Sequence, residues 1–558
     1  MRPHTLLLLV TLLGWIAAPL QSRQGKAEDP TTSKIDSGFM MREGANNPIF
    51  VRFEDQLFKK AGDYEAWCEK NRGKGRRSLR KLVIETLKKK QKDTLTRLTS
   101  TLGKMVEEGK LPNWKRYWIV NGFAARADGP TIEALAAMKD VAFVYRMRAA
   151  PQYELPRRRT FSDIQLQALT EFDKKWKSDA EEPFSAEGLS IPWNVERIQA
   201  PEVWKRGHLG QGVVVALLDT GLLPADSLTR ALWRNPGETP NGRDDDHNGF
   251  VDDLYGWNFQ TNHPFMPGDS GRMPHGSICG GIIAGRPYNE KKLITGLAPR
   301  ARIMVLQGMG QLGAYEYALE NGADLLSMSY MWVNMKLGNY RGVFRLAHEH
   351  LAAGGIVACG GAGNFGPGSR RRAPAGKQIA LPKDIPCVIA AAGLVESGER
   401  SPASSEGPCT WDDVVFYEDY PPSNPLQKPD VTGFFGGYPV WCRTNVRAPN
   451  WKTVWEGPGG IGLVVGPRGN SFSGPHAVGV SALMLSANPD LLPIDVQAIL
   501  RATAKDLGPK GWDKSYGTGL MQALPAVLEA EKRAGKKGGK GPARKSERSS
   551  QPKKKKKA

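Results

Sequence analysis

The sequence is poor in the residues that build metal clusters and redox centres. Its 558 residues include only 6 cysteines and 8 histidines. No two cysteines form a Cys-x-x-Cys pair, so zinc-binding and thiol-redox motifs of that kind are not expected. One disulfide, between Cys409 and Cys442, is the pairing that we expect in an oxidising compartment.

Long hydrophobic runs are also rare. One lies near the start of the chain, where Arg2 precedes a largely apolar segment from Leu6 to Ala18 and small and polar residues follow. This segment is too short to cross a bilayer comfortably and has the layout of a secretory signal. We therefore predict a signal peptide in residues 1–22 and a protein that acts outside the cytoplasm, secreted or periplasmic. Elsewhere no run reaches the roughly 18 apolar residues that a membrane helix needs.

Acidic residues are in the minority, and the formal net charge is +20. Much of the excess lies in residues 531–558, which contain 13 Lys and Arg, 2 Glu and almost no apolar side chain. Such a segment cannot bury enough apolar surface to offset the entropy lost on ordering, so we predict a disordered basic tail. The tail can contact anionic surfaces. Because the remaining chain is only mildly basic, specific nucleic-acid binding is not expected.

The part of the chain that follows the signal shows a mixed pattern of helices and strands. Apolar residues recur at helical spacing from residue 79 to residue 111. A strand from Tyr117 to Val120, a helix from Pro130 to Met138 and a strand from Val141 to Tyr145 come next. This order predicts a small α+β unit.

The domain boundaries follow changes in composition. We assign residues 23–150 to the α+β unit, with its core at about 113–148. Residues 151–190 are polar, contain the Arg-rich stretch PRRRTF, and are predicted to be a linker and processing region. In residues 191–530, short apolar segments alternate with helical ones, which predicts a doubly wound parallel sheet with flanking helices.

Four residues of the α/β part stand where chemistry is expected. Asp219 and Asn364 each follow a predicted buried strand, and ligands in parallel sheets bind beyond the carboxyl ends of the strands. His275 precedes a run of small residues, and Ser471 stands at the start of an apolar helix, beside free backbone donors. Each residue taken alone also fits a structural role. Together they supply a nucleophile, a base, a group that orients the base and a donor for a developing anion.

Two of these residues have competing assignments. Asp-Thr-Gly at Asp219 also marks aspartic proteases, but those need two such aspartates and the chain contains this tripeptide once. His476 is an alternative base for Ser471. Five helical steps turn it about 140° away from Ser471, so we predict a buried structural histidine.

The chain order Asp, His, Ser and the surrounding motifs resemble the subtilisin-like serine proteases, the subtilase family (peptidase S8). The resemblance covers about residues 192–528 and includes WNVERIQAPEVWKRGHLGQGVVVALLDTG, HGSICGGIIAG and GNSFSGPHAVGVSALMLSANPDL. The stretch YWIVNGFAARADGPTIEALAAMKDVAFVYR likewise resembles the propeptide of that family.

The resemblance implies a secreted serine endopeptidase that is made as a zymogen and acts on proteins or peptides. Ser471 would attack the peptide carbonyl, His275 would take its proton, Asp219 would orient the imidazole, and Asn364 would help to hold the oxyanion. The propeptide would act as an intramolecular inhibitor. We expect a monomer.

Some residues depart from the pattern of the family. Asn470 replaces a threonine, and SMSYMWVN from Ser327 stands where the family has a Ser-Leu-Gly-Gly strand that pairs with substrate. Bulky Tyr330, Met331 and Trp332 in this stretch motivate an alternative, a catalytically silent subtilase-fold protein that binds peptides or a surface.

An acidic insertion, RNPGETPNGRDDDHNGFVDDLYGWNF, matches the early part of an EF-hand-type calcium loop. The twelfth position is Tyr255 instead of Glu, so a bidentate ligand must come from elsewhere or be absent. A solvated acidic turn is the alternative. We predict structural calcium with ligands from Asp244, Asp246, Asn248, Phe250, Asp252 and Asp253.

Overall fold

The structure is a computed structural model that describes residues 34–147, 161–179, 188–266, 274–287, 292–333, 337–374, 376–446 and 450–536. The predicted signal peptide, most of the Arg-rich stretch and the tail beyond Lys536 lie outside the described residues. Among the described helices, none combines the length and the apolar character that crossing a membrane requires.

The larger part of the molecule is built on an eight-stranded sheet with the order β12-β11-β10-β9-β5-β8-β6-β7. All its neighbouring strands pair in parallel except the last two, β6 and β7. The predicted parallel α/β sheet is therefore confirmed. The strands are β5 (Val214–Leu218), β6 (Gly256–Asn258), β7 (His263–Pro264), β8 (Arg302–Gln307), β9 (Leu325–Ser327), β10 (Val357–Gly361), β11 (Val388–Leu394) and β12 (Val431–Phe434).

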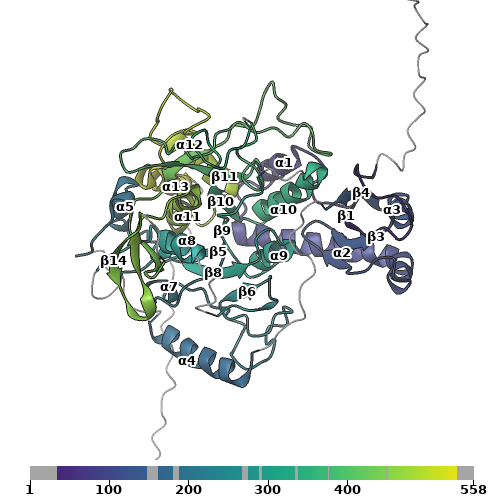
Figure 1. Cartoon of the computed structure of the whole chain (residues 1–558), viewed down its shortest axis with the longest axis horizontal. Helices are drawn as coiled ribbons and strands as arrows, with labels where there is room; N and C mark the ends of the chain where they lie inside the picture. Colours follow the sequence, from purple (N-terminus) through teal and green to yellow (C-terminus); the bar gives the residue numbers. More distant parts are fainter. Residues whose placement is uncertain are drawn as a thin grey trace, which may run out of the picture.

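Side chains of β5 alternate between two hydrophobic layers. Val215 and Leu217 pack with α8 and α11, whereas Ala216 and Leu218 pack with α9 and α10. Both faces of the sheet are thus covered by helices, as Figure 1 shows. The helices of this part are α5 (Trp193–Arg197), α6 (Ala200–Trp204), α7 (Asp226–Thr229), α8 (His275–Ala284), α9 (Leu312–Glu320), α10 (Arg341–Ala353), α11 (Asn470–Ala487), α12 (Pro493–Thr503) and α13 (Ala523–Lys536). A small antiparallel sheet in the same part has the order β13 (Val440–Arg443), β15 (Ile461–Val465), β14 (Lys452–Glu456).

The N-terminal unit is a four-stranded antiparallel sheet with the order β2-β3-β1-β4. Its elements are β1 (Asn47–Phe53), α1 (Asp63–Lys70), α2 (Arg76–Glu107), β2 (Lys115–Tyr117), β3 (Gly122–Ala127), α3 (Gly129–Ala136) and β4 (Val141–Arg146). The predicted helices and last strand agree with α2, α3 and β4. The expected strand from Tyr117 to Val120 is wrong, because the chain turns after Tyr117. The strand at this place is β2, which ends at Tyr117 and pairs with β3. The two central strands of the sheet, β3 and β1, were not predicted from the sequence.

The N-terminal unit docks on the helical face formed by α9 and α10 (Figure 1). Backbone groups of Ile119 bind both helices: its N–H donates to the Glu316 carboxylate at 3.0 Å, and its carbonyl accepts from His350 Nδ1 at 2.6 Å. Farther along the interface, Arg76 and Arg80 of α2 pair with the buried Asp324 at 3.1 and 3.2 Å. The unit is therefore held by buried charges as well as by apolar packing.

Two predicted flexible segments contain helices. The predicted linker, 151–190, includes α4 (Asp163–Asp179), where Asp173 accepts from Arg234 at 2.7 Å and Leu169 joins the hydrophobic core. The first residues of the predicted tail complete α13, and Glu531 pairs with Arg206 at 2.6 Å. Both segments gain apolar or ionic partners from the folded unit, which composition alone does not reveal.

The predicted disulfide is wrong. All six cysteines are buried and free. Cys409 exchanges backbone hydrogen bonds with Leu426, whereas Cys442 lies in β13 of the small sheet.

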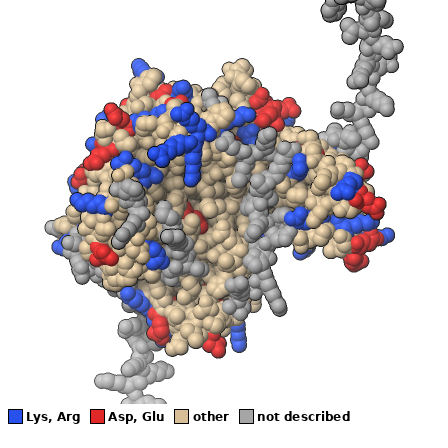
Figure 2. Space-filling view, viewed as in Figure 1, with Lys and Arg blue, Asp and Glu red and all other residues tan. Residues whose placement is uncertain are grey.

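Charged side chains on the face seen in Figure 2 are of both signs and gather along the rim of the α/β part and on the N-terminal unit. The middle of this face carries mostly uncharged residues. The net positive charge of the chain therefore does not form a single basic patch over the described residues of this face.

The buried ion pairs at the docking interface give a testable prediction. Asp324→Ala leaves the buried guanidinium of Arg76 without its acidic partner, and we expect a loss of about 3 kcal/mol in the free energy of unfolding, measured by urea denaturation. As a control, Glu69→Gln removes an exposed partner of Arg72 and should change stability by no measurable amount. Equal effects of the two substitutions would contradict the role given to Asp324.

Candidate active site

Asp219 and His275 form an ion-paired hydrogen bond. Asp219 directly follows β5 and is buried, and it accepts from the Thr220 N–H at 2.8 Å. His275 is the first residue of α8, and its Nδ1 lies 2.7 Å from Asp219 Oδ1. Gly276 allows this approach, because a β carbon there would overlap the carbonyl oxygen of Gly221. The structure thus brings two of the four predicted residues into direct contact.

The pair shifts the pKa of both side chains. Burial disfavours the protonated imidazole of His275, but the charge of Asp219 and its hydrogen bond outweigh burial and raise the pKa of His275 well above its usual value. For Asp219, burial works against the charged form, while the charge of His275 prevails and lowers the pKa. The Nδ1 hydrogen bond leaves Nε2 as the nitrogen that can exchange a proton with a third group.

Ser471 lies in the first turn of α11, close to this pair. Cys279 contacts both His275 and Ser471: its Sγ is 3.8 Å from His275 Nδ1 and 3.5 Å from the Ser471 carbonyl oxygen. The Ser471 hydroxyl donates to the carbonyl of Ser329 at 3.3 Å, and the Ser329 hydroxyl donates back to the Ser471 carbonyl at 2.7 Å. Sequence reasoning did not single out Ser329 or Cys279 for a contact with Ser471.

Asn364 follows β10 and bonds the residue that precedes Ser471. Its Oδ1 accepts from the Asn470 N–H at 2.7 Å, which fixes the orientation of the amide. A β carbon at Gly469 would lie 3.4 Å from Asn364 Nδ2 and 3.8 Å from the Ser471 nitrogen. Two N–H donors therefore border one small space beside the serine, which suits a developing oxyanion.

The departure at Asn470 has a structural explanation. Its side-chain amide donates to the Gly363 carbonyl at 2.6 Å and to Ser404 Oγ at 2.9 Å. The side chain that replaces threonine therefore ties the first turn of α11 to the segment that carries Asn364.

His476 is the buried structural residue that helix geometry predicts. Its Nδ1 donates to the Phe472 carbonyl at 2.7 Å, and its Nε2 lies 3.1 Å from the Asn194 amide. Burial lowers its pKa to about 4, so the imidazole is neutral. Both ring nitrogens are engaged away from Ser471.

The acidic insertion brings three carboxylates together. One oxygen atom from each of Glu238, Asp246 and Asp253 lies within 4.8 Å of the other two, and Glu238 and Asp253 are buried. Burial raises the pKa of Glu238 to about 7 and that of Asp253 to about 6. Three oxygen donors close together, two of them on buried carboxylates that are costly to ionise in isolation, suit a hard divalent cation.

The remaining predicted ligands have other contacts. Asp244 accepts from the N–H groups of Asn248 and Gly249, the Asn248 amide donates to Asp246 and Asp253, and Phe250 packs on Trp257 at a ring distance of 4.9 Å. Asp252 accepts from the N–H groups of Asn241 and Gly242. The EF-hand pattern missed Glu238, because this residue stands six positions before the first aspartate of that pattern.

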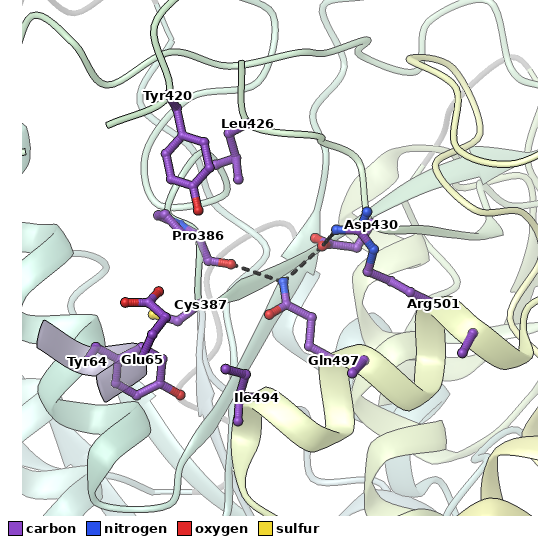
Figure 3. Close-up of a pocket in the computed structure, with 12 residues that line it drawn as sticks. Tyr64, Glu65, Pro386, Cys387, Tyr420, Leu426, Asp430, Ile494, Gln497 and Arg501 are labelled. Atoms are coloured by element: carbon purple, nitrogen blue, oxygen red, sulfur yellow. Dashed lines mark hydrogen bonds and ion pairs between the residues drawn. The ribbon is translucent and has the colours of Figure 1, made fainter. Parts of the chain in front are cut away.

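A cavity elsewhere in the molecule lies outside this site. It has a volume of about 490 Å³ and opens between Tyr64 and Glu65 of α1 and Gln497 and Arg501 of α12 (Figure 3). None of Asp219, His275, Asn364 and Ser471 lines it.

Comparison with known proteins gives one family. A family model described as the subtilase family matches residues 210–519. Bacillopeptidase F of Bacillus subtilis is 23% identical over 549 residues, which cover 92% of this chain and 33% of that protein. The calcium-dependent protease of Trichormus variabilis is 27% identical over 355 residues, which cover 58% of this chain and 47% of that protein.

The solved structures include a similar fold. Fervidolysin from Fervidobacterium pennivorans aligns with a TM-score of 0.50 and 17% identity, covering 87% of this chain and 62% of that chain. This chain thus spans less than two thirds of the length of each of the three proteins.

The ion pair predicts how His275 titrates. In an NMR titration, we expect His275 to lose its proton at a pH well above 6.5, whereas His476 titrates near 4. Asp219→Asn removes the attracting charge and leaves burial as the dominant influence, so the pKa of His275 should fall below 6.5. An unchanged pKa of His275 in this variant would contradict the assigned cause.

Proposed function

The chain belongs to the subtilase family of serine endopeptidases, and from this premise we propose that it hydrolyses peptide bonds through Asp219, His275 and Ser471. The observation that carries the proposal is the 2.7 Å bond between His275 Nδ1 and Asp219, with Ser471 and Asn364 grouped beside it. Substrates would be proteins or peptides.

The arrangement supports a two-step acyl transfer. The Asp219 bond holds the proton on Nδ1, so His275 Nε2 can accept the proton of the Ser471 hydroxyl as the oxygen attacks the carbonyl carbon. The hydroxyl must first leave the carbonyl of Ser329 and turn toward the imidazole, as apo hydroxyls often do on substrate binding. Asn364 Nδ2 and the Ser471 N–H then stabilise the oxyanion, and water later releases the acyl group by the reverse proton path.

The N-terminal unit fits the role of an inhibitory propeptide. We infer that the protein is a zymogen whose unit at 34–147 stays bound to α9 and α10 until a cut between this unit and the α/β part allows its release. The signal-like segment at 1–22 supports export, so maturation would take place outside the cytoplasm.

Calcium is the metal that the acidic cluster fits best. Glu238, Asp246 and Asp253 would hold it through carboxylate oxygens, and Ca²⁺ prefers such ligands in flexible geometry. The metal would supply positive charge to carboxylates that burial otherwise destabilises. The similar protein from Trichormus variabilis is named a calcium-dependent protease, which agrees with this assignment.

Labelling of the serine tests the catalytic proposal. A fluorophosphonate probe should label the purified full chain after any self-processing, and Ser471→Ala should abolish both labelling and digestion of casein. Asn364→Ala should still be labelled but should lose about 10² to 10³ in kcat, the cost known for one oxyanion donor in subtilisin.

The negative outcome is equally informative. A folded and processed protein that neither reacts with the probe nor digests casein would contradict the proposal. It would favour the catalytically silent, peptide-binding alternative.

Calcium should change how stability depends on pH. Without metal, the raised pKa of Glu238 means that folding favours its protonated form, so stability falls as pH rises from about 4.5 to about 7. Added Ca²⁺ should remove this fall and raise Tm at neutral pH, measured by calorimetry with and without a chelator.

Variants of the cluster provide the control. Asp253→Asn should remove the effect of Ca²⁺ on Tm, whereas Asp226→Asn, an exposed acid outside the cluster, should keep it. The assignment fails if Ca²⁺ leaves the Tm of the unmodified chain unchanged.

A further inference from the structure

The space beside Ser471 is bounded by two segments that leave neighbouring strands. β9 and β10 pair in parallel, so their carboxyl ends lie side by side at one edge of the sheet. The segment after β9 reaches Ser329, whose carbonyl accepts from the Ser471 hydroxyl. The segment after β10 carries Gly363 and Asn364, and Asn364 accepts from the N–H of Asn470, the residue before Ser471.

This arrangement determines where a substrate side chain must go. If the scissile carbonyl carbon lies at Ser471 Oγ and its oxygen at Asn364, the residue that bears this carbonyl extends between the two segments. Its side chain therefore points into the wedge between the chain after Ser329 and Gly363. Crevices at the carboxyl ends of adjacent parallel strands are the usual ligand sites of such sheets.

Met331 already occupies this wedge. A β carbon at Gly363 would overlap the Met331 Cε atom, so the end of the thioether lies directly against Gly363. The Met331 Sδ atom accepts from the Ala380 N–H at 3.2 Å. The same β carbon at Gly363 would lie 2.7 Å from Ser405 Oγ, so Ser405 and Met331 together fill the space on this side of Gly363.

The backbone on both sides of Met331 is held in place. The buried ammonium of Lys383 donates to the Tyr330 carbonyl, and the Trp332 N–H donates to the Leu381 carbonyl at 2.9 Å. The Tyr330 hydroxyl shares a hydrogen bond of 2.8 Å with the Tyr315 hydroxyl of α9. With its neighbours anchored, Met331 can leave the wedge only by rotation of its own side chain.

We infer that Met331 is a specificity-determining residue that closes the subsite for the side chain on the acyl side of the scissile bond. The inference rests on the function proposed above and names its substrate class: peptides with glycine, alanine or serine at that position. A larger side chain would have to displace the thioether from Gly363 and Ala380, and it would lose the packing that an open apolar pocket provides.

Peptidyl diphenyl phosphonates that differ only in the residue next to phosphorus test this inference. Each reacts by attack of the Ser471 oxygen on phosphorus with loss of a phenoxide, and mass spectrometry measures the rate of adduct formation. For the full chain after any self-processing, we expect the alanine probe to react at least about 100-fold faster than the phenylalanine probe. Met331→Gly should raise the relative rate of the phenylalanine probe by about 100-fold, whereas Met331→Leu, which keeps the volume, should keep the preference for alanine.

The outcomes separate this inference from the proposed function. A plain fluorophosphonate, which carries no peptide side chain, reports whether Ser471 is reactive. If the fluorophosphonate labels Ser471, two results would overturn the role of Met331 alone. One is equal rates for both peptidyl probes, and the other is an unchanged preference for alanine in Met331→Gly. Absence of any fluorophosphonate labelling would overturn the serine endopeptidase itself, and the inference with it.

Discussion

The close contact between the first turn of α11 and the strands β10 and β11 is the constraint on which the rest of the site depends. A β carbon at Gly361 would overlap the backbone of Asn470, and one at Gly393 would overlap its side chain. Only glycine lets the helix approach so closely, and this approach places the Ser471 N–H beside Asn364. The Asn470 amide then ties the first turn of α11 to the segment after β10 through the Gly363 carbonyl, and this segment carries Asn364.

The charged pair depends on the same kind of packing. Asp219 is almost fully buried at the end of β5, and the charge and hydrogen bond of His275 outweigh the cost of burial. Small residues at the start of α8 let the helix begin directly above the loop after β5. Backbone proximity therefore produces the electrostatics: the pKa of His275 is high because the helix and the strand end are close enough for a 2.7 Å bond.

Local sequence pointed to the four residues proposed for catalysis better than it predicted their surroundings. Asp219, His275, Asn364 and Ser471 could be named because each stands at a strand or helix end that hydrophobic patterning reveals. The contacts of Glu238 and Met331 could not be predicted, because their partners come from distant segments. These partners are Asp253 for Glu238, and Gly363 and Ala380 for Met331. The helix α4 was missed for a related reason, since the ion pair between Asp173 and Arg234 that anchors it appears only in the folded chain.

Helix α9 links the acidic cluster to the N-terminal unit. On one side, the Tyr317 hydroxyl donates to Asp253 at 2.5 Å, and the adjacent Glu316 accepts from the Ile119 N–H of the N-terminal unit at 3.0 Å. Burial raises the pKa of Glu316 to about 8, so ionisation of this carboxyl opposes docking as pH rises through that value. Helix α9 therefore lies between the acidic cluster and the N-terminal unit: Tyr317 bonds Asp253 of the cluster, and the neighbouring Glu316 bonds the N-terminal unit.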